Sequence, residues 1–549
     1  MAAVPVLVPN TRRASANASF NAGTLLAQLG SRELVIGLSG PLGSGVDEVG
    51  VVVAHQLRDM GYDVVTLKLS TFIRAYSRLL KNPPAPTAAE LDALTGTARY
   101  ETYQDLGNQL RSEFGNEVLA SLVATHILLD RQKRHPGEDL RAITPGKVAY
   151  IVDQLKHPEE CQLLRAVYND HFYLIGVLGS SESRKHRLQA LHIDAVNAER
   201  IMERDRKQAE KYGQKLEKTL QLADFFVRNA KSNHVEIGVG IGRFLKLIHG
   251  STQVFPTRVE QGMYSAYSAA ISSACLSRQV GAAIHDRNGV LIATGCNDVP
   301  KGGGGLYQQA QGDDDRCAFL HGGVCFNHLE KDAIRSEISA ELARELKAMV
   351  EEDGQRYASL SGRENAIAHR LSVRVREDTR LNDLIEFSRA VHAEMDALVS
   401  LARSGGGRTQ DGVLFTTTYP CHNCARHIIA AGIRTVYFVE PYEKSLALKL
   451  HSDAIDHDAT TEESLSMWEA HHAEKRRVKF YHFEGVAPRR YLELFSATSS
   501  RKDDRTGRAL EFVQNEAKKK QAQLLESYIE IESRLVDKLS ERGIVPQSV

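Results

Sequence analysis

Two short runs of metal-binding and proton-carrying side chains stand in the second half of the chain. His392 and Glu394 are separated by one alanine, and Cys421 and Cys424 follow Pro420 with two residues between them. Zinc is commonly held by cysteine sulfur and imidazole nitrogen, and three protein ligands leave the fourth tetrahedral position open for water. A carboxylate beside such a site can carry protons. The sequence therefore predicts a catalytic zinc ion held by His392, Cys421 and Cys424, with Glu394 as the proton carrier.

The order of these residues also predicts a reaction. An H-x-E run followed by P-C-x-x-C is the pattern of zinc-dependent nucleobase deaminases. Zinc lowers the pKa of a bound water to about 7, and Glu394 would pass the proton to a ring nitrogen and to departing ammonia. Pro420 suits the first turn of a helix, where Cys421 and Cys424 would share one face and the helix dipole favours thiolates. We expect His392 on a neighbouring helix.

Each part of the pattern has a simpler explanation when it is taken alone. His392-Ala-Glu394 by itself is typical of an exposed helix face. Cys421 and Cys424 by themselves could form half of a structural zinc site or a redox pair. The two runs together, in this order and with Pro420 in place, favour the deaminase interpretation.

Beyond this pattern, the sequence resembles the deoxycytidylate deaminase family. The run Cys275–Ile284 (CLSRQVGAAI) is similar to the first-strand motif of the family. The run Thr294–Gly302 (TGCNDVPKG) is similar to its G-Y-N-G-x-P-x-G loop, with Cys296 in place of the usual Tyr and Asp298 in place of Gly. The two departures leave the details of this loop open.

The resemblance also implies further site residues. Asn297 would contact the sugar and the pyrimidine of the substrate, and Tyr442 would pack on the base. An ordinary turn residue and an ordinary core or surface tyrosine are the alternatives. Some members of the family hold a second, structural zinc, and residues in comparable places here are Cys275, Cys317, His321 and Cys325. Buried free cysteines and a surface histidine are the simpler explanation for that set.

The whole architecture resembles a narrower group, the bacterial antiphage deaminases of deoxycytidine nucleotides. The resemblance covers most of the chain and is strongest from Val259 to Phe495. It implies deamination of dCTP and dCMP, which would deplete the nucleotide pool that a phage needs. It also implies an inhibitory small RNA, an allosteric deoxynucleoside triphosphate and assembly into a homo-oligomer.

A glycine-rich turn near the N-terminus has the frame of a phosphate-binding P-loop. Gly40, Gly43, Ser44 and Gly45 stand between a strand-like and a helix-like run, and Asp153 ends a later strand at a Walker-B position. However, Val46 replaces the lysine and Asp47 the serine or threonine that complete a P-loop. The turn therefore favours a kinase-like fold without phosphoryl transfer, serving nucleotide sensing or a structural or partner-binding role. A turn that binds no ligand is a further alternative.

The composition narrows the class of protein. The 549 residues contain 69 basic and 69 acidic side chains, and this balance disfavours a polynucleotide as the main substrate. No apolar run reaches the ~20 residues that cross a bilayer, and residues 1–30 lack a signal-peptide core. The seven cysteines include a C-x-x-C pair, which in a reducing compartment indicates metal or catalysis. We expect a cytoplasmic protein.

Apolar runs predict an α/β protein, because strands alternate with helical stretches. Strands are expected at Glu33–Ser39, Tyr62–Leu67, Val148–Asp153, Phe172–Leu178, Ala223–Val227, Gln279–His285, Val290–Ala293, Val413–Thr417 and Thr435–Val439. Helices are expected at Val46–Met60, Val259–Leu276, about Asn327–Glu352, about Asn382–Ser404 and roughly Asp504–Glu541.

These elements divide into two domains with extensions. We expect a P-loop kinase-like parallel-sheet domain followed by a cytidine-deaminase-like α/β/α domain. The predicted boundaries are a poorly ordered N-terminus at 1–30, the kinase-like domain at 31–232, a connecting segment at 233–258, the deaminase domain at 259–497 and an amphipathic C-terminal helix at 498–549. That helix could seal a subunit interface.

Three functions compete on these observations. The first is a deaminase of free deoxycytidine nucleotides, and the second is a base editor acting on RNA or DNA. One tryptophan and a neutral charge balance offer the second little support. The third is a nucleotide kinase or a regulatory protein with a relic deaminase. The intact zinc pattern argues against a relic, and the altered P-loop argues against a kinase.

Overall fold

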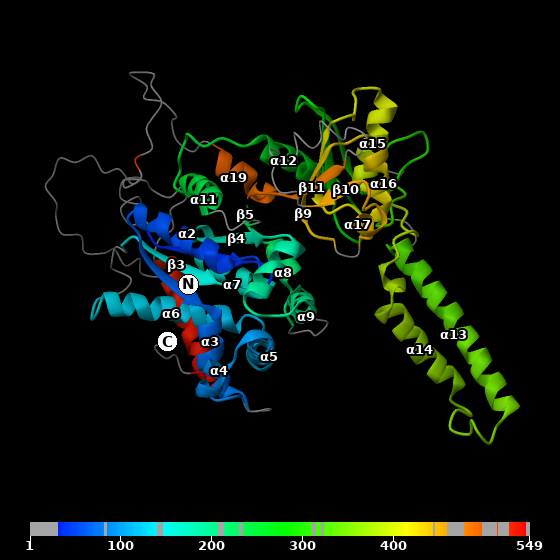
Figure 1. The fold of residues 1–549 in the computed structure, drawn as a ribbon, viewed down its shortest axis with the longest axis horizontal. Coiled ribbons are helices and arrows are strands. Elements are labelled where there is room, and N and C mark those ends of the chain that lie inside the picture. The colour runs from blue at the N-terminus through cyan, green and yellow to red at the C-terminus, as the bar shows by residue number, and fades with distance from the viewer. Residues whose placement is uncertain are drawn as a thin grey trace, which may run out of the picture.

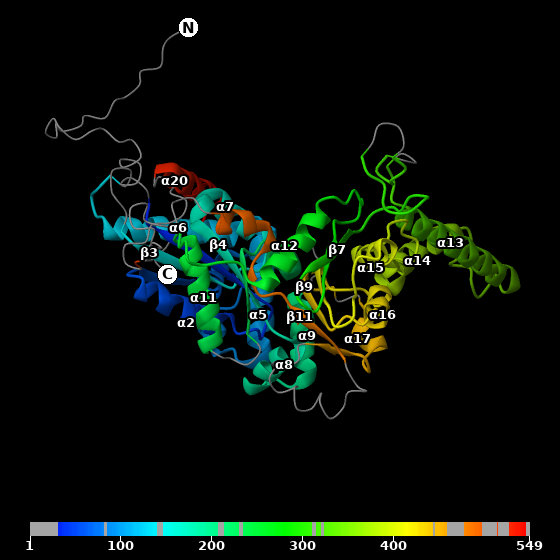
Figure 2. The ribbon, with the colours of Figure 1, turned by 90° about the horizontal axis from the view of Figure 1, so that it is seen from above.

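Two six-stranded sheets organise the molecule, and helices cover both (Figures 1 and 2). The computed structural model describes residues 31–81, 85–139, 146–206, 213–229, 234–309, 314–319, 323–442, 445–457, 477–496, 513 and 526–544. Most strand pairs in both sheets are parallel, which confirms the predicted α/β class. The kinase-like character of the first domain and the domain boundaries stay predictions, and the predicted N-terminal extension lies outside the described residues.

The first sheet has β1 at its centre, in the order β12-β5-β4-β1-β3-β2. Its five N-terminal strands are parallel, and three of them, β1, β3 and β4, are buried along their whole length. Such continuous apolar runs are typical of parallel strands with helices on both faces. The strands are β1 (Leu34–Ser39), β2 (Asp63–Lys68), β3 (Val148–Asp153), β4 (Phe172–Leu178) and β5 (Phe225–Arg228).

Helices follow these strands on both faces of the sheet (Figure 1). They are α2 (Val46–Asp59), α3 (Leu69–Tyr76), α4 (Ala88–Ala93), α5 (Gly96–Phe114), α6 (Val118–Arg134), α7 (Pro158–Tyr168), α8 (Ser181–Ala190), α9 (Ala195–Arg206), α10 (Leu216–Leu220) and α11 (His234–Ile248), with short 3₁₀ turns at Ser77–Leu79 and Asn169–His171.

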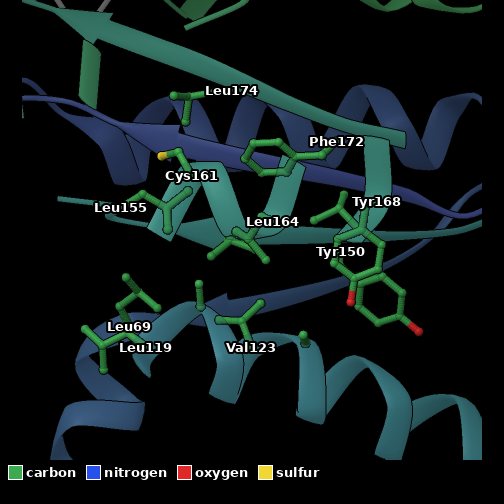
Figure 3. Close-up of a cluster of buried hydrophobic side chains, with 14 of the residues drawn as sticks. Leu69, Leu119, Val123, Tyr150, Leu155, Cys161, Leu164, Tyr168, Phe172 and Leu174 are labelled. Carbon is green, nitrogen blue, oxygen red and sulfur yellow. The ribbon is translucent and has the colours of Figure 1, made fainter. Parts of the chain in front are cut away.

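The core of this domain lies between the sheet and two of its helices. Figure 3 shows Leu119 and Val123 of α6 facing Leu164 of α7 and Tyr150 of the sheet. Cys161 of α7 is also buried here, and its thiol is free. This cysteine therefore has a packing role, as free cysteines in cores usually do.

The second sheet has the order β10-β11-β9-β8-β6-β7. The predicted hairpin at its edge is confirmed, since β6 and β7 pair antiparallel on either side of the turn Asp286–Gly289. Its strands are β6 (Gly281–His285), β7 (Leu291–Cys296), β8 (Val413–Thr418), β9 (Thr435–Glu440), β10 (Ile455–His457) and β11 (Val478–His482). Its helices are α12 (Arg258–Ala270), α15 (Ala393–Ser404), α16 (His422–Ala430) and α17 (Ala447–Leu450).

Two helices project from this domain as a hairpin (Figures 1 and 2). They are α13 (Phe326–Glu352) and α14 (Glu364–Asp378), followed by a 3₁₀ turn at Arg380–Asp383. The first of them matches the predicted helix Asn327–Glu352. The second lies in a stretch for which we predicted no helix.

Two predicted helices extend too far. The helix expected over Val259–Leu276 ends at Ala270, because the following residues form part of a pocket wall held by hydrogen bonds to Asn297 and Asp298. The helix expected over Asn382–Ser404 begins only at Ala393, and His392 is its N-cap. The prediction that His392 lies within a helix is therefore wrong by one position.

A strap after β11 returns from the second sheet to the first. Its strand β12 (Gly485–Val486) pairs antiparallel with β5, and the 3₁₀ turn Pro488–Arg490 and helix α19 (Tyr491–Phe495) follow. Arg489 of the strap donates to Asp224, a fully buried carboxylate beside β5. Glu260 of α12 accepts from Val486 N at 2.8 Å. The strap thus connects the two sheets through bonds to both Asp224 and Glu260.

The C-terminal helix α20 (Glu526–Glu541) packs on the first domain (Figure 2). Arg131 of α6 is buried and bonds to both Glu33 and Glu532, and Tyr528 donates to Glu33 at 2.9 Å. The part of the predicted helix before 526 lies outside the described residues, apart from Val513. In the described ranges, none of the helices combines the length and apolar composition needed to cross a bilayer.

Candidate active site

The three predicted zinc ligands meet at one point. One ligand atom from each of His392, Cys421 and Cys424 lies within 4.8 Å of the other two. His392 Nδ1 is 3.3 Å from Cys421 Sγ and 3.3 Å from Cys424 Sγ. Zinc–sulfur and zinc–nitrogen bonds of about 2.3 and 2.0 Å fit donor atoms at this spacing. Two sulfurs and one imidazole nitrogen therefore suit a zinc ion with one position left open.

Local sequence places the ligands at the N-termini of two helices. His392 is the N-cap of α15 and Cys421 is the N-cap of α16, one residue after Pro420. The Cys424 backbone N–H donates to Cys421 Sγ at 3.4 Å, so this sulfur caps its own helix. Both helix N-termini carry partial positive charge, which favours thiolates. A hydrogen bond with the Cys424 thiol, followed by the bond to His392, lowers the pKa of Cys421 to about 4.

Glu394 lies beside the three ligands. It occupies the first turn of α15 and is 4% exposed, and Cys424 Sγ is 3.4 Å from Glu394 Oε2. Burial, the largest effect, raises the pKa of this carboxyl. A carboxyl with a raised pKa next to a metal site can both take and return a proton near neutral pH.

A pocket opens above this group. Its wall includes His392, Glu394 and Cys421, so the predicted ligands and the predicted proton carrier face the same space. The other lining residues are Cys275, Ser277, Arg278, Val280, Asn297, Asn327, Ile385, Ser388, Ala390, Ala393, Thr418, Tyr419 and Tyr442. Both residues that we predicted to contact the substrate, Asn297 and Tyr442, are among them.

The side chain of Asn297 is already bonded to the pocket wall. Its Oδ1 accepts from Val280 N at 2.7 Å, and its Nδ2 donates to Arg278 O at 2.8 Å. Its predicted contact with a sugar would have to use the remaining N–H or lone pair. Tyr442 also lines the pocket, and Ser445 Oγ donates to Pro420 O at 2.7 Å.

One pocket residue and its ion-pair partner escaped the sequence analysis. Arg278 brings a guanidinium to the pocket, where it forms an ion pair with Glu440 at the end of β9. Glu440 Oε2 also accepts from Thr418 Oγ1 at 3.4 Å. Arg278 lies inside the first-strand motif, so a basic residue in that motif was the available signal. Glu440 gave none, because its partners are distant in sequence.

The proposed second metal set does not gather in the described part of the chain. Cys275, Cys317 and Cys325 are half-buried free cysteines, and no group of three metal ligands other than His392, Cys421 and Cys424 occurs among the described residues. Cys325 Sγ lies 3.7 Å from Ser277 Oγ. His321 lies outside the described residues, so the second zinc stays a prediction.

The glycine-rich turn joins β1 to α2, as predicted. Gly45 is the N-cap of α2 in a left-handed conformation, and Gly43 has a φ of +81°. A Cβ at Gly43 would lie 2.6 Å from the carbonyl oxygen of Arg184. The start of α8 therefore presses directly against the turn.

Side chains of the protein itself fill the space around this turn. Asp205 of α9 accepts from Leu42 N at 2.6 Å and from Lys156 Nζ, which also donates to Gly40 O at 2.7 Å. Arg184 Nε donates to Leu42 O at 2.9 Å. A carboxylate thus takes an N–H of the turn, the kind of group that a phosphate takes in a P-loop.

Asp153 and Ser44 lie nearby and are buried. Asp153 Oδ1 and Ser44 Oγ have no hydrogen-bond partner among the described residues. Burial is the main reason that the pKa of Asp153 is raised to about 6. The nucleotide site predicted at Gly40, Gly43, Ser44, Gly45 and Asp153 stays a prediction.

Comparison with known proteins places the second domain in context. Residues 256–440 match the family model described as the cytidine and deoxycytidylate deaminase zinc-binding region. This range contains every predicted zinc ligand and Glu394. The match supports hydrolytic nucleotide deamination by this part of the chain and implies zinc.

Three known proteins to which the chain is similar differ in how much of each is matched. The chain is 27% identical over 180 residues to the deoxycytidylate deaminase of Enterobacteria phage T2, which covers 33% of this chain and 78% of that protein. It is 41% identical over 56 residues to ComE operon protein 2 of Bacillus subtilis (strain 168), and this match covers 10% of the chain and only 29% of that protein. A solved dCMP deaminase of cyanophage S-TIM5, in complex with dCMP and dUMP, aligns at 17% identity over 42% of this chain and 99% of that one, with a TM-score of 0.22.

Proposed function

We propose that this protein is a zinc-dependent deaminase that converts deoxycytidine nucleotides, dCTP, dCMP or both, into the deoxyuridine nucleotides and ammonia. The observation that carries the proposal is the convergence of His392, Cys421 and Cys424 on one point, with Glu394 beside it and a pocket above. The family match over residues 256–440 supports the same chemistry.

The residues of the chain divide the work of the reaction. His392, Cys421 and Cys424 hold the zinc ion, which when bound activates a water for attack on the amino-bearing carbon. Glu394 would take the proton that the water loses and deliver it to the ring nitrogen; it would then take the proton of the new hydroxyl group and pass it to the amino group, which leaves as ammonia as the carbonyl forms. Burial favours this role, because the raised pKa of Glu394 makes its protonated form accessible.

The pocket suits a nucleotide rather than a bare base. Arg278 brings a positive charge to the pocket, and a guanidinium is well suited to bind phosphate. Tyr442 offers a ring for stacking on the base, and Asn297 also lines the pocket. The choice of deoxycytidine nucleotides rests on the resemblance to deoxycytidylate deaminases and on the phage T2 and T4 relatives, which carry that activity in their names.

Further parts of the proposal rest on the resemblance to antiphage deaminases. They are depletion of the nucleotide pool during infection, restraint by a small RNA, allosteric control by a deoxynucleoside triphosphate and assembly into a homo-oligomer. Phosphoryl transfer by the first domain is not part of the proposal, because Asp205 fills the glycine-rich turn and Val46 stands at the lysine position.

The test is an assay of ammonia release from dCMP, dCTP, CMP, CTP and a deoxycytidine oligonucleotide. We expect turnover of the free deoxynucleotides only. Glu394→Ala should lower the rate by about 10²–10⁴-fold, the usual range for losing a proton carrier, and should keep its zinc. Activity restricted to the oligonucleotide would instead identify a polynucleotide deaminase and overturn the proposal.

A further inference from the structure

One wall of the pocket is an extended segment without regular secondary structure. Residues 273–280 run between α12 and β6, and Cys275, Ser277, Arg278 and Val280 of this segment line the pocket. Within the segment, Cys275 N donates to Ser273 Oγ at 3.2 Å and Gln279 Nε2 donates to Ser273 O at 2.8 Å. Its position relative to the metal ligands depends on the further bonds that it makes to other parts of the chain.

Asn297 holds the C-terminal end of this wall. Its side chain bonds to Val280 N and Arg278 O, and its own backbone N–H donates to Val280 O at 3.1 Å. Ser273 Oγ donates to Asn297 O at 2.5 Å. The wall is thus fastened to one residue at both ends.

Asp298 also bonds to this wall and connects it to the segment that carries the metal ligand His392. It is 2% exposed, and its Oδ2 accepts from Ala274 N at 3.0 Å. Its backbone oxygen accepts from Val391 N at 3.0 Å, directly before His392. Asp298 therefore bonds to the pocket wall through its side chain and to the ligand segment through its backbone.

Arg316 fixes the carboxylate of Asp298. This arginine is 5% exposed, and one of its NH groups donates to Asp298 Oδ2 at 3.1 Å. Its Nε and second NH₂ group bind both oxygens of Asp314 at 2.8 and 2.5 Å. The backbone oxygen of the neighbouring Asp315 accepts from Arg389 at 2.9 Å, and Arg389 stands between the pocket-lining residues Ser388 and Ala390. A fork of five donors can hold two carboxylates in fixed positions, which a lysine cannot do.

We propose that Arg316 is a positioning residue for the nucleotide pocket: by holding Asp298, it sets the distance between the wall 273–280 and the segment that carries His392. The inference rests on the proposed function for its kinetic consequences. Without Arg316, the buried Asp298 carboxylate would lose its cation, and its bond to Ala274 would no longer be fixed in direction. The wall that presents Arg278 to the substrate would then move relative to the metal centre.

The experiment compares Arg316→Gln with Arg111→Gln. Arg111 is a matched control, because it forms an equally buried ion pair with Glu160 in the first domain, away from the pocket. Both variants should lower the melting temperature. Only Arg316→Gln should raise KM for dCMP or dCTP, by about tenfold or more, with kcat within about threefold and zinc content unchanged. Arg316→Lys keeps the charge, so its KM should lie between those of the wild type and Arg316→Gln.

Other outcomes would overturn the inference. If KM is unchanged in Arg316→Gln, or if KM rises equally in Arg111→Gln, Arg316 only stabilises the fold. A lysine variant no better than the glutamine variant would also contradict it. If the wild-type protein turns over no cytidine nucleotide, the proposed function fails by itself. Hydrogen exchange of the peptide covering 270–280 then decides: faster exchange in Arg316→Gln alone supports the positioning role, and unchanged exchange refutes it.

Discussion

The two domains each place a motif where a strand runs into a helix, and the two places differ in what occupies them. Pro420–Cys424 follows β8 and opens α16, and Gly40–Gly45 follows β1 and opens α2. At the first, three side chains converge on a common centre and leave room for an ion. At the second, Asp205 has taken an N–H of the turn and α8 covers it.

The difference shows that the residue spacing and backbone position of a motif do not by themselves determine its function. Glycine spacing and a helix N-terminus are present at the turn, but a phosphate there would meet the carboxylate of Asp205. In the second domain, two sulfurs and one imidazole nitrogen surround the centre, at the positive ends of two helices. We therefore expect Cys421 to serve catalysis and Asp205 to contribute to the stability of the fold.

The largest effect should come from a substitution at the zinc site. Cys421→Ala removes one of the three zinc ligands. Bound zinc and all measurable deamination should be lost, because alanine has no donor atom to replace the thiolate. Elemental analysis of the purified protein measures the metal directly. Cys161→Ala is the matched control, because Cys161 is a buried cysteine in the core of the first domain, and it should keep its zinc. Full metal occupancy in Cys421→Ala would refute the ligand assignment.

A smaller effect should come from a substitution at the glycine-rich turn. Asp205→Ala leaves Lys156 as a buried cation without its carboxylate, which should cost about 3–5 kcal/mol of unfolding free energy. Urea unfolding monitored by circular dichroism measures the loss, and deamination at 25 °C should be unchanged where the protein is still folded. Asp92→Ala removes a carboxylate from an exposed pair with Arg74 and should cost less than about 1 kcal/mol. A stable Asp205→Ala that binds ATP would show that the turn is a nucleotide site after all.

The smallest effect should appear in the pH dependence of stability at Asp153. Its pKa is raised from 3.8 to about 6 in the folded protein, mainly by burial. The folded state therefore holds this proton more tightly than the unfolded chain, and the resulting stability is present at low pH and lost as pH rises through about 6. Asp153→Asn should remove this loss, roughly 2–3 kcal/mol. Melting temperatures of the two proteins should converge below about pH 4, where the carboxyl is protonated in both the folded and the unfolded state, and separate toward about pH 8, with the variant more stable. A variant less stable than wild type at about pH 8 would mean that the charged carboxylate has a favourable partner.

Much of the framework was predictable because its signals are local. The buried parallel strands β3 and β4 appear in the sequence as unbroken apolar runs, and their bounds match the prediction. The zinc ligands were predictable because their spacing follows from one helix turn and the coordination of the ion. The hairpin at Asp286–Gly289 followed from its Asn-Gly pair.

Other features depended on contacts between distant residues. Asp205 meets Leu42 across 163 positions, and Arg316 meets Asp298 across a loop, so neither pairing has a pattern in the sequence. The helix expected to contain His392 was extended too far, because residues 382–391 contain helix-compatible side chains. Tertiary bonds such as that from Val391 to Asp298 hold part of this stretch outside the helix.

The strap at Gly485–Val486 has a consequence for synthesis. Because β12 completes the edge of the first sheet beside β5, the ribosome must release nearly the whole chain before that sheet has its last strand. Arg489 also reaches Asp224 only at that stage. The N-terminal domain consequently carries an open sheet edge throughout translation of the second domain.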